Sequence, residues 1–145
     1  MVISKDFKEF LELLNEHKVK YLVVGGYAVA FHGHPRYTKD LDICIKPDKK
    51  NAEKIMKVLK DFGFGSLEIK VEDFLNRDVV IQLGNLPNRI DLITELDGVN
   101  FDRCYSSKVE IETDGIKIKF ISLENLKKNK KAAGRYQDLA DLENL

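Results

Sequence analysis

The chain has 145 residues, of which 43% are hydrophobic and 33% charged, a composition typical of a single folded domain rather than a disordered or membrane-embedded chain. Its 24 basic and 24 acidic residues cancel, so a polyanionic partner would have to bind a local patch. The two cysteines have no CxxC spacing, which argues against a zinc site and a disulfide framework. Because no signal-peptide pattern and no run of about 18 apolar residues is present, we expect a cytoplasmic protein without a membrane-spanning segment.

The first thirty residues predict a helix, a strand and a second helix. Apolar residues recur at helical spacing behind Ser4, which predicts an N-capped helix that ends near His17. Residues 21 to 24 favour a short strand that stops at Gly25-Gly26. Residues 27 to 31 then predict a short helix, so this segment is a strand–turn–helix unit.

The next segment predicts another strand and helix. Residues 40 to 45 alternate between polar and apolar side chains, so the strand has one apolar face and one face that carries Asp40 and Asp42. Asp48 predicts the N-cap of a helix that Gly63 terminates.

Two hairpins are predicted in the second half of the chain. Residues 79 to 83 and 89 to 93 form the first pair of strands, and residues 109 to 113 and 116 to 121 form the second. The second pair is joined by Asp114-Gly115, which suits the positive φ angles of a type I′ turn.

Two helices complete the predicted elements. Ser122 caps a helix that runs to about Ala133, and residues 136 to 145 predict a last helix with Leu139 and Leu142 facing inward. No internal repeat or linker interrupts the sequence, which predicts one domain over residues 1–145. Residues 64 to 76 show no clear pattern.

Two features of the first half carry chemistry. Asp40 and Asp42 lie two residues apart on a strand, so both carboxylates project from one face, and such a pair can bind hard cations such as Mg²⁺. Gly25-Gly26 would let backbone N–H groups approach phosphate oxygens, although a tight turn alone also explains the two glycines.

The combination of these features resembles a known signature. An apolar residue, Gly25-Gly26, thirteen intervening residues and then Asp40-Leu41-Asp42-Ile43 resemble the DNA polymerase beta-like nucleotidyltransferases. In that superfamily a third carboxylate follows on a later strand, and Asp91 matches its order and apolar surroundings. The tail, from Ser122-Leu123-Glu124-Asn125-Leu126 to Asp141-Leu142, is similar to small bacterial and archaeal nucleotidyltransferases related to abortive-infection toxins.

The resemblance implies a fold, a reaction and a set of site residues. The fold is an α+β nucleotidyltransferase fold, with a mixed β-sheet flanked by helices. The reaction moves a nucleoside monophosphate from a nucleoside triphosphate to an acceptor hydroxyl with release of pyrophosphate, and uses two Mg²⁺ or Mn²⁺ ions. The expected catalytic and metal-binding residues are Asp40, Asp42 and Asp91. The expected nucleotide-binding residues are Gly25, Gly26, Arg36, Lys39 and Lys130. Arg36 and Lys39 are included because they lie beside the acidic pair, where they would contact phosphate or orient a carboxylate.

Lys130 stands apart from the neighbouring lysines. Helical phase places it in line with Leu123 and Leu126, whereas Lys127 and Lys128 face solvent. Its cation would either meet the triphosphate, as the resemblance implies, or form an ion pair with Asp138 or reach solvent along its own stem.

Two other sets of residues are given structural interpretations. His32 and His34 have no further ligands at zinc spacing, so a zinc site is not expected. Cys44 shares the face of the two aspartates and is interpreted as a buried, inert thiol.

The acceptor is the least determined part of the hypothesis. Because the chain leaves little room for an acceptor-binding domain, we expect a macromolecular acceptor, RNA or protein, or the help of a partner chain. RNA would be held weakly by Lys127 to Lys131 with Arg36 and Arg135. The alternatives are a non-catalytic, antitoxin-like binding module and an antibiotic-modifying nucleotidyltransferase. An acidic acceptor pocket would favour the antibiotic, and a basic groove would favour RNA.

Overall fold

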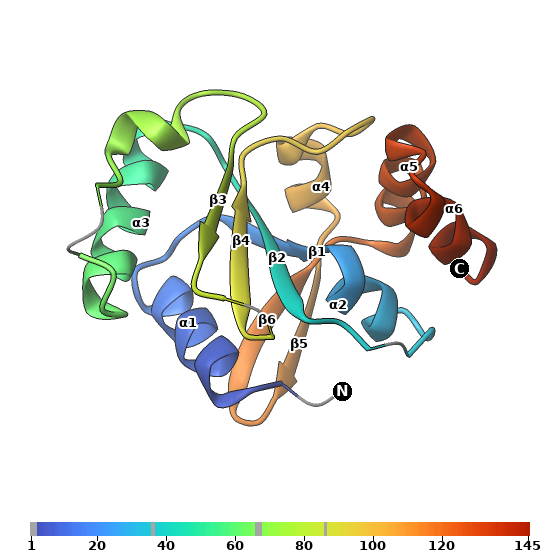
Figure 1. The fold of residues 1–145 in the computed structure, drawn as a ribbon, viewed down its shortest axis with the longest axis horizontal. Coiled ribbons are helices and arrows are strands. Elements are labelled where there is room, and N and C mark those ends of the chain that lie inside the picture. Colours follow the sequence, from blue (N-terminus) through green and yellow to red (C-terminus); the bar gives the residue numbers. More distant parts are fainter. Residues whose placement is uncertain (1–2, 36, 66–67, 86) are drawn as a thin grey trace.

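The computed structural model describes residues 3–35, 37–65, 68–85 and 87–145 (Figure 1). The helices are α1 (Lys5–Glu16), α2 (Gly25–Phe31), α3 (Lys49–Asp61), the short 3-10 helix η1 (Val71–Phe74), α4 (Phe101–Ser106), α5 (Leu123–Ala133) and α6 (Tyr136–Glu143). The strands are β1 (Tyr21–Val24), β2 (Asp40–Ile45), β3 (Val80–Leu83), β4 (Arg89–Ile93), β5 (Val109–Thr113) and β6 (Ile116–Phe120).

The strands form one mixed sheet in the order β3-β4-β2-β1-β6-β5. The β2–β4 and β1–β6 pairs are parallel, and the other three pairs are antiparallel. Both predicted hairpins are present, and Asp114 and Gly115 adopt φ angles of 51° and 80° at the second turn. The prediction of an α+β fold with a mixed sheet is therefore confirmed.

Helices lie on both sides of the sheet. In Figure 1, α1 and α3 lie to one side, and α2, α4, α5 and α6 lie to the other. The apolar face of β2 is buried, since Leu41, Ile43 and Ile45 are each at most 2% exposed. This alternation leaves the opposite face of β2 to its two aspartates, so burial of the core fixes the side on which the site lies.

The predicted helix caps are formed. Ser4, Asp48 and Ser122 each accept a hydrogen bond from the backbone N–H three residues further on. Gly134 ends α5 in the left-handed conformation, with a φ of 67°.

Two expectations about the helices are wrong. The helix after β1 begins at Gly25 rather than at residue 27, because Gly25 adopts a φ of 64° and turns the chain from strand to helix within one residue. Leu139 is 44% exposed instead of inward. The buried side chains of α6 are Asp138 and Asp141, so ion pairing rather than apolar burial sets the orientation of this helix.

The unpatterned segment contains one short element. Residues 66 and 67 lie outside the described part of the chain, and η1 follows with Phe74 fully buried beside α3. The helix α4, capped by Asn100, was not predicted. Among the described residues, no helix is both long and apolar enough to cross a membrane.

Candidate active site

The acidic trio is formed by the parallel pairing of β2 with β4. Asp42 lies opposite Asp91 in the strand register, and Asp40 lies one pleat repeat away on the same face. Each of the three residues offers a carboxylate oxygen, and these oxygens lie within 4.8 Å of one another. The structure thus brings Asp91 of β4 to the two aspartates of β2, as the sequence predicted for residues on two different strands.

The strand–turn–helix unit lies against this trio. Val24 at the end of β1 pairs with Asp42. The next residue, Gly25, approaches the Asp42 side chain so closely that a Cβ atom there would overlap the carboxylate. Only glycine fits, since the close approach excludes a side chain and the positive φ angle disfavours one. The turn therefore brings main-chain atoms directly to the carboxylates.

The carboxylates of the trio carry more negative charge than their surroundings neutralise. Burial, together with the neighbouring charges of Asp40 and Asp91, raises the pKa of Asp42 to about 8. Burial also raises the pKa of Asp91, although the hydrogen bond and charge of Arg89 oppose this effect. Converging oxygen donors with unneutralised charge fit a hard divalent cation such as Mg²⁺ or Mn²⁺.

Arg89 is a member of this cluster that the sequence analysis did not single out. Its Nε donates to Asp91 Oδ1 at 2.8 Å and its Nη2 to Asp91 Oδ2 at 3.1 Å. The same Nη2 lies 3.6 Å from Asp40 Oδ2. The signal was present in the sequence, because Arg89 precedes Asp91 by two residues on a strand and must share its face.

A cavity of about 580 Å³ opens beside the trio. Asp40, Asp42, Gly25 and Gly26 line it on the sheet side, and Lys39 also faces it. The remaining wall comes from the chain around β3 and β4 and from α5 and α6. It includes Tyr37, Asp78, Val80, Glu95, Leu96, Asp97, Lys130, Arg135 and Asp138.

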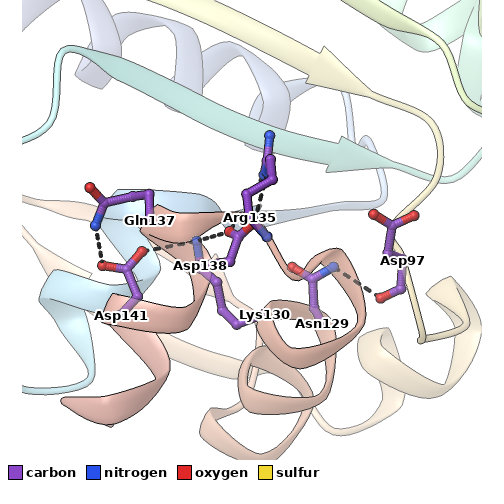
Figure 2. A network of polar contacts seen from close by, with 7 residues as sticks. All are labelled: Asp97, Asn129, Lys130, Arg135, Gln137, Asp138 and Asp141. Carbon is purple, nitrogen blue, oxygen red and sulfur yellow. Dashed lines mark hydrogen bonds and ion pairs between the residues drawn. The ribbon is translucent and has the colours of Figure 1, made fainter.

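Lys130 faces inward, as helical phase predicted, and is only 5% exposed. Its Nζ lies 3.0 Å from Asp138 Oδ1 and 3.1 Å from Asp141 Oδ2 (Figure 2). Arg135 adds a second cation, with its Nε 2.7 Å from Asp138 Oδ2, and Gln137 donates to Asp141. The structure thus contains the predicted ion pair with Asp138. A contact between Lys130 and the triphosphate stays a prediction. Such a contact is possible because Lys130 lines the cavity.

The other candidate residues are placed as follows. Arg36 lies outside the described residues. Cys44 is buried, and burial raises the pKa of its thiol, as expected for an inert cysteine. His32 forms a hydrogen bond with the Ile121 carbonyl, and within the described ranges no histidine belongs to a group with metal-binding geometry.

Structural comparison shows the fold. TM1012 of Thermotoga maritima, a protein assigned as a nucleotidyltransferase, superposes with a TM-score of 0.66 at 19% identity, over 94% of this chain and 88% of that one. The lincomycin-bound lincosamide antibiotic adenylyltransferase LnuA superposes with a TM-score of 0.58 at 18% identity, over 99% of this chain and 96% of that one. The chain has the nucleotidyltransferase fold.

Sequence comparison shows the family. The chain belongs to the aminoglycoside-2''-adenylyltransferase family, whose model matches residues 6–145. A comparison with curated proteins gives no match. The chain is therefore a nucleotidyltransferase, and the resemblance stated from the glycine turn and the three aspartates is confirmed.

Proposed function

We propose that the protein transfers AMP from ATP to a hydroxyl group of a small, amine-bearing acceptor, with divalent metal ions held by Asp40, Asp42 and Asp91. The proposal is carried by the convergence of these three carboxylates, of which Asp40 and Asp42 line a molecule-sized cavity. In this reaction the acceptor oxygen bonds to the α-phosphorus, and the bond from that phosphorus to the oxygen bridging to the β-phosphate breaks. Pyrophosphate leaves, and the hydroxyl proton passes to a carboxylate of the site.

Each part of the site has a role in this reaction. Mg²⁺ or Mn²⁺ ions, when bound, neutralise phosphate charge and make the acceptor hydroxyl more acidic. Gly25 and Gly26 leave room for phosphate oxygens beside Asp42. Lys39 lines the cavity and would add positive charge toward the triphosphate. Lys130 also lines the cavity, and it would contact a phosphate only by giving up part of its pairing with Asp138 and Asp141.

The names of the related proteins support the choice of the donor. Both the matching family and LnuA are described as adenylyltransferases, which transfer AMP. The complete acidic trio supports catalysis over the alternative of a non-catalytic, antitoxin-like module, which would not need three converging carboxylates.

The charge of the cavity wall supports a small cationic acceptor. Asp78, Glu95 and Asp97 all line the cavity, and within the described chain no ion pair joins any of them to a basic residue. In contrast, both Lys130 and Arg135 already pair with Asp138. Such a wall attracts amino groups and repels phosphates.

This proposal replaces the acceptor that we expected from the sequence. RNA would need a basic groove, and the basic residues of this cavity are largely engaged. The related proteins also point away from a macromolecule, since LnuA is a lincosamide antibiotic adenylyltransferase and the family takes its name from aminoglycosides. Aminoglycosides carry both hydroxyl and amino groups and fit the acidic wall.

The test is incubation of the protein with labelled ATP, Mg²⁺ and, separately, an aminoglycoside panel, a lincosamide panel, total RNA and a protein fraction. We expect label in an aminoglycoside and pyrophosphate in equal amount, and we expect chelation of the metal to stop the reaction. Asp42→Asn is the matched inactive control. Label in the RNA or protein fraction alone would refute the small acceptor, and no label in any fraction would refute the transfer.

Charge reversal separates the acceptor from the donor. Glu95→Lys and Asp97→Lys should raise the KM for a cationic acceptor by roughly tenfold, because each replaces an attraction by a repulsion at the cavity wall. The KM for ATP should change little or fall. Equal effects on both substrates would show that the acidic wall does not hold the acceptor.

A further inference from the structure

Arg89 uses both carboxylate oxygens of Asp91. The guanidinium binds Asp91 Oδ1 at 2.8 Å and Oδ2 at 3.1 Å, and Asp91 itself is only 6% exposed. These are the oxygens that Asp91 has to offer to a metal ion. The guanidinium therefore competes directly with a cation for the third carboxylate of the trio.

The position of Arg89 is fixed by the strand register. Arg89 lies opposite Asp40, and Asp91 lies opposite Asp42. The four side chains therefore form two neighbouring cross-strand pairs on one face of β2 and β4. Nη2 of Arg89 also lies 3.6 Å from Asp40 Oδ2. The guanidinium thus bridges Asp40 and Asp91, whereas the Asp42 side chain lies against Gly25.

Formal charges show what this bridge does. With all three carboxylates ionised, the trio and Arg89 together carry two negative charges, which one divalent cation neutralises. A second divalent cation would leave the site positively charged, at a cost that the low local dielectric increases. The negative charge of a triphosphate removes that cost.

We propose that Arg89 is a positioning residue that makes occupancy of the metal position at Asp91 depend on bound nucleotide. This inference rests on the proposed function and adds an order of assembly to it. Without nucleotide, Arg89 holds Asp91 in place and prevents a second ion from binding there. With nucleotide, the added negative charge allows the second ion to bind, so the reactive arrangement forms only when the substrate is present.

The test counts Mn²⁺ ions per chain by electron paramagnetic resonance. Mn²⁺ is added alone or with α,β-methylene-ATP, whose α,β bridge cannot be cleaved. The wild type should bind one Mn²⁺ alone and two with the analogue. Arg89→Gln should bind the second Mn²⁺ without the analogue, because removal of the guanidinium frees both oxygens of Asp91 and halves the net positive charge that two ions would leave on the site.

Two further variants separate charge from structure. Arg89→Lys keeps the positive charge and should bind one Mn²⁺ alone, like the wild type. Lys46→Gln removes a cation that pairs with Asp102 at 3.1 Å outside the cavity, and it should also bind one. Melting temperatures of all variants show that each one is folded.

The outcomes distinguish the inference from the proposed function. If Arg89→Gln binds one Mn²⁺ alone, as the wild type does, or binds Mn²⁺ less tightly than the wild type, Arg89 serves only to support Asp91 and the inference is wrong. The proposed function would stand in that case. If the wild type binds no Mn²⁺ even with the analogue, the proposed function fails and the inference fails with it.

Discussion

Two groups of carboxylates border the same cavity, and their charges are balanced very differently. In the α5–α6 group, Asp138 and Asp141 are 2% and 1% exposed, and both pair with Lys130, while Arg135 binds Asp138 as well. The two negative charges of this group are therefore balanced by the two positive charges of Lys130 and Arg135. In the trio on β2 and β4, Arg89 is the one base that forms an ion pair with the three acids among the described residues, and the pKa of Asp42 rises to about 8 as a result of burial and its acidic neighbours.

The difference distinguishes carboxylates that hold the fold together from carboxylates that serve a functional site. A buried carboxylate that has full partners fixes the packing of the elements that carry it, here α6 against α5. A carboxylate cluster that the protein leaves unbalanced is costly until a cation arrives, and such clusters gather at functional sites. The same residue type thus has opposite effects on stability at the two places.

The largest expected effect is on catalysis. Asp42→Asn should lower AMP transfer by roughly 1000-fold, since it removes a metal ligand that contributes several kcal/mol to the transition state. Above pH 8, where Asp42 is ionised, the melting temperature should stay the same or rise, because the neutral amide relieves repulsion within the trio. Transfer rates and thermal melting test both parts, and a variant that melts far below the wild type would show that the trio stabilises the fold.

The α5–α6 group should show the opposite behaviour. Lys130→Met should lower the free energy of unfolding by about 3–5 kcal/mol, because it leaves Asp138 and Asp141 buried without their shared partner. Lys128→Met is the control, since Lys128 pairs only with exposed Glu124 and should lose no more than about 0.5 kcal/mol. Urea denaturation measures both values. Equal losses would contradict the distinction between the two groups.

A smaller effect is expected at the turn beside the trio. Gly25→Ala should cost about 1–2 kcal/mol for the left-handed backbone, and it should also lower transfer because the new Cβ displaces the Asp42 side chain. Gly63→Ala is a matched control. Gly63 also has a positive φ, but a Cβ added there would meet no atom within 4 Å. Stability should fall in both variants and transfer in only one. Unchanged transfer in Gly25→Ala would disprove the contact.

The smallest effect concerns pH. Burial alone would raise the pKa of Asp138, but hydrogen bonds from Arg135 and Lys130 outweigh it and lower the pKa below the ordinary 3.8. The stability that Asp138 contributes is therefore fully present above pH 3.8 and is lost as the pH falls through the lowered value. Urea denaturation between about pH 3 and 5 should show a steeper acid loss in the wild type than in Asp138→Asn. Parallel curves would contradict this assignment.

Much of the fold follows from local patterns in the sequence. The caps at Ser4, Asp48 and Ser122 and the turn at Asp114-Gly115 use side chains or backbone angles that only a few residue types provide, so each could be predicted. The orientation of α6 could not, because helical phase was assigned from Leu139 while the buried partners of Asp138 lie partly on another helix. The short helix α4 has too few residues to show a period.

The site was predicted in part. Strand alternation and the family resemblance identified Asp40, Asp42 and Asp91, and the structure brings them together. Alternation also implied that Arg89 faces the same way as Asp91, but its approach to Asp40 depends on the register of β4 beside β2, a long-range pairing that local patterns do not contain. The charge of the cavity wall likewise depends on residues that meet only in the folded chain.

The parallel pairing of β2 with β4 also has a consequence for folding. Asp42 and Asp91 are partners in this pairing, yet nearly fifty residues of chain separate them. Contacts between residues so far apart in sequence form late, because closing a long loop lowers the entropy of the chain before the contact stabilises it. The complete trio is thus a product of nearly complete folding, and nascent or partly unfolded chains have two of its carboxylates but not the third. Recovery of the trio during refolding would report on the pairing of β2 with β4.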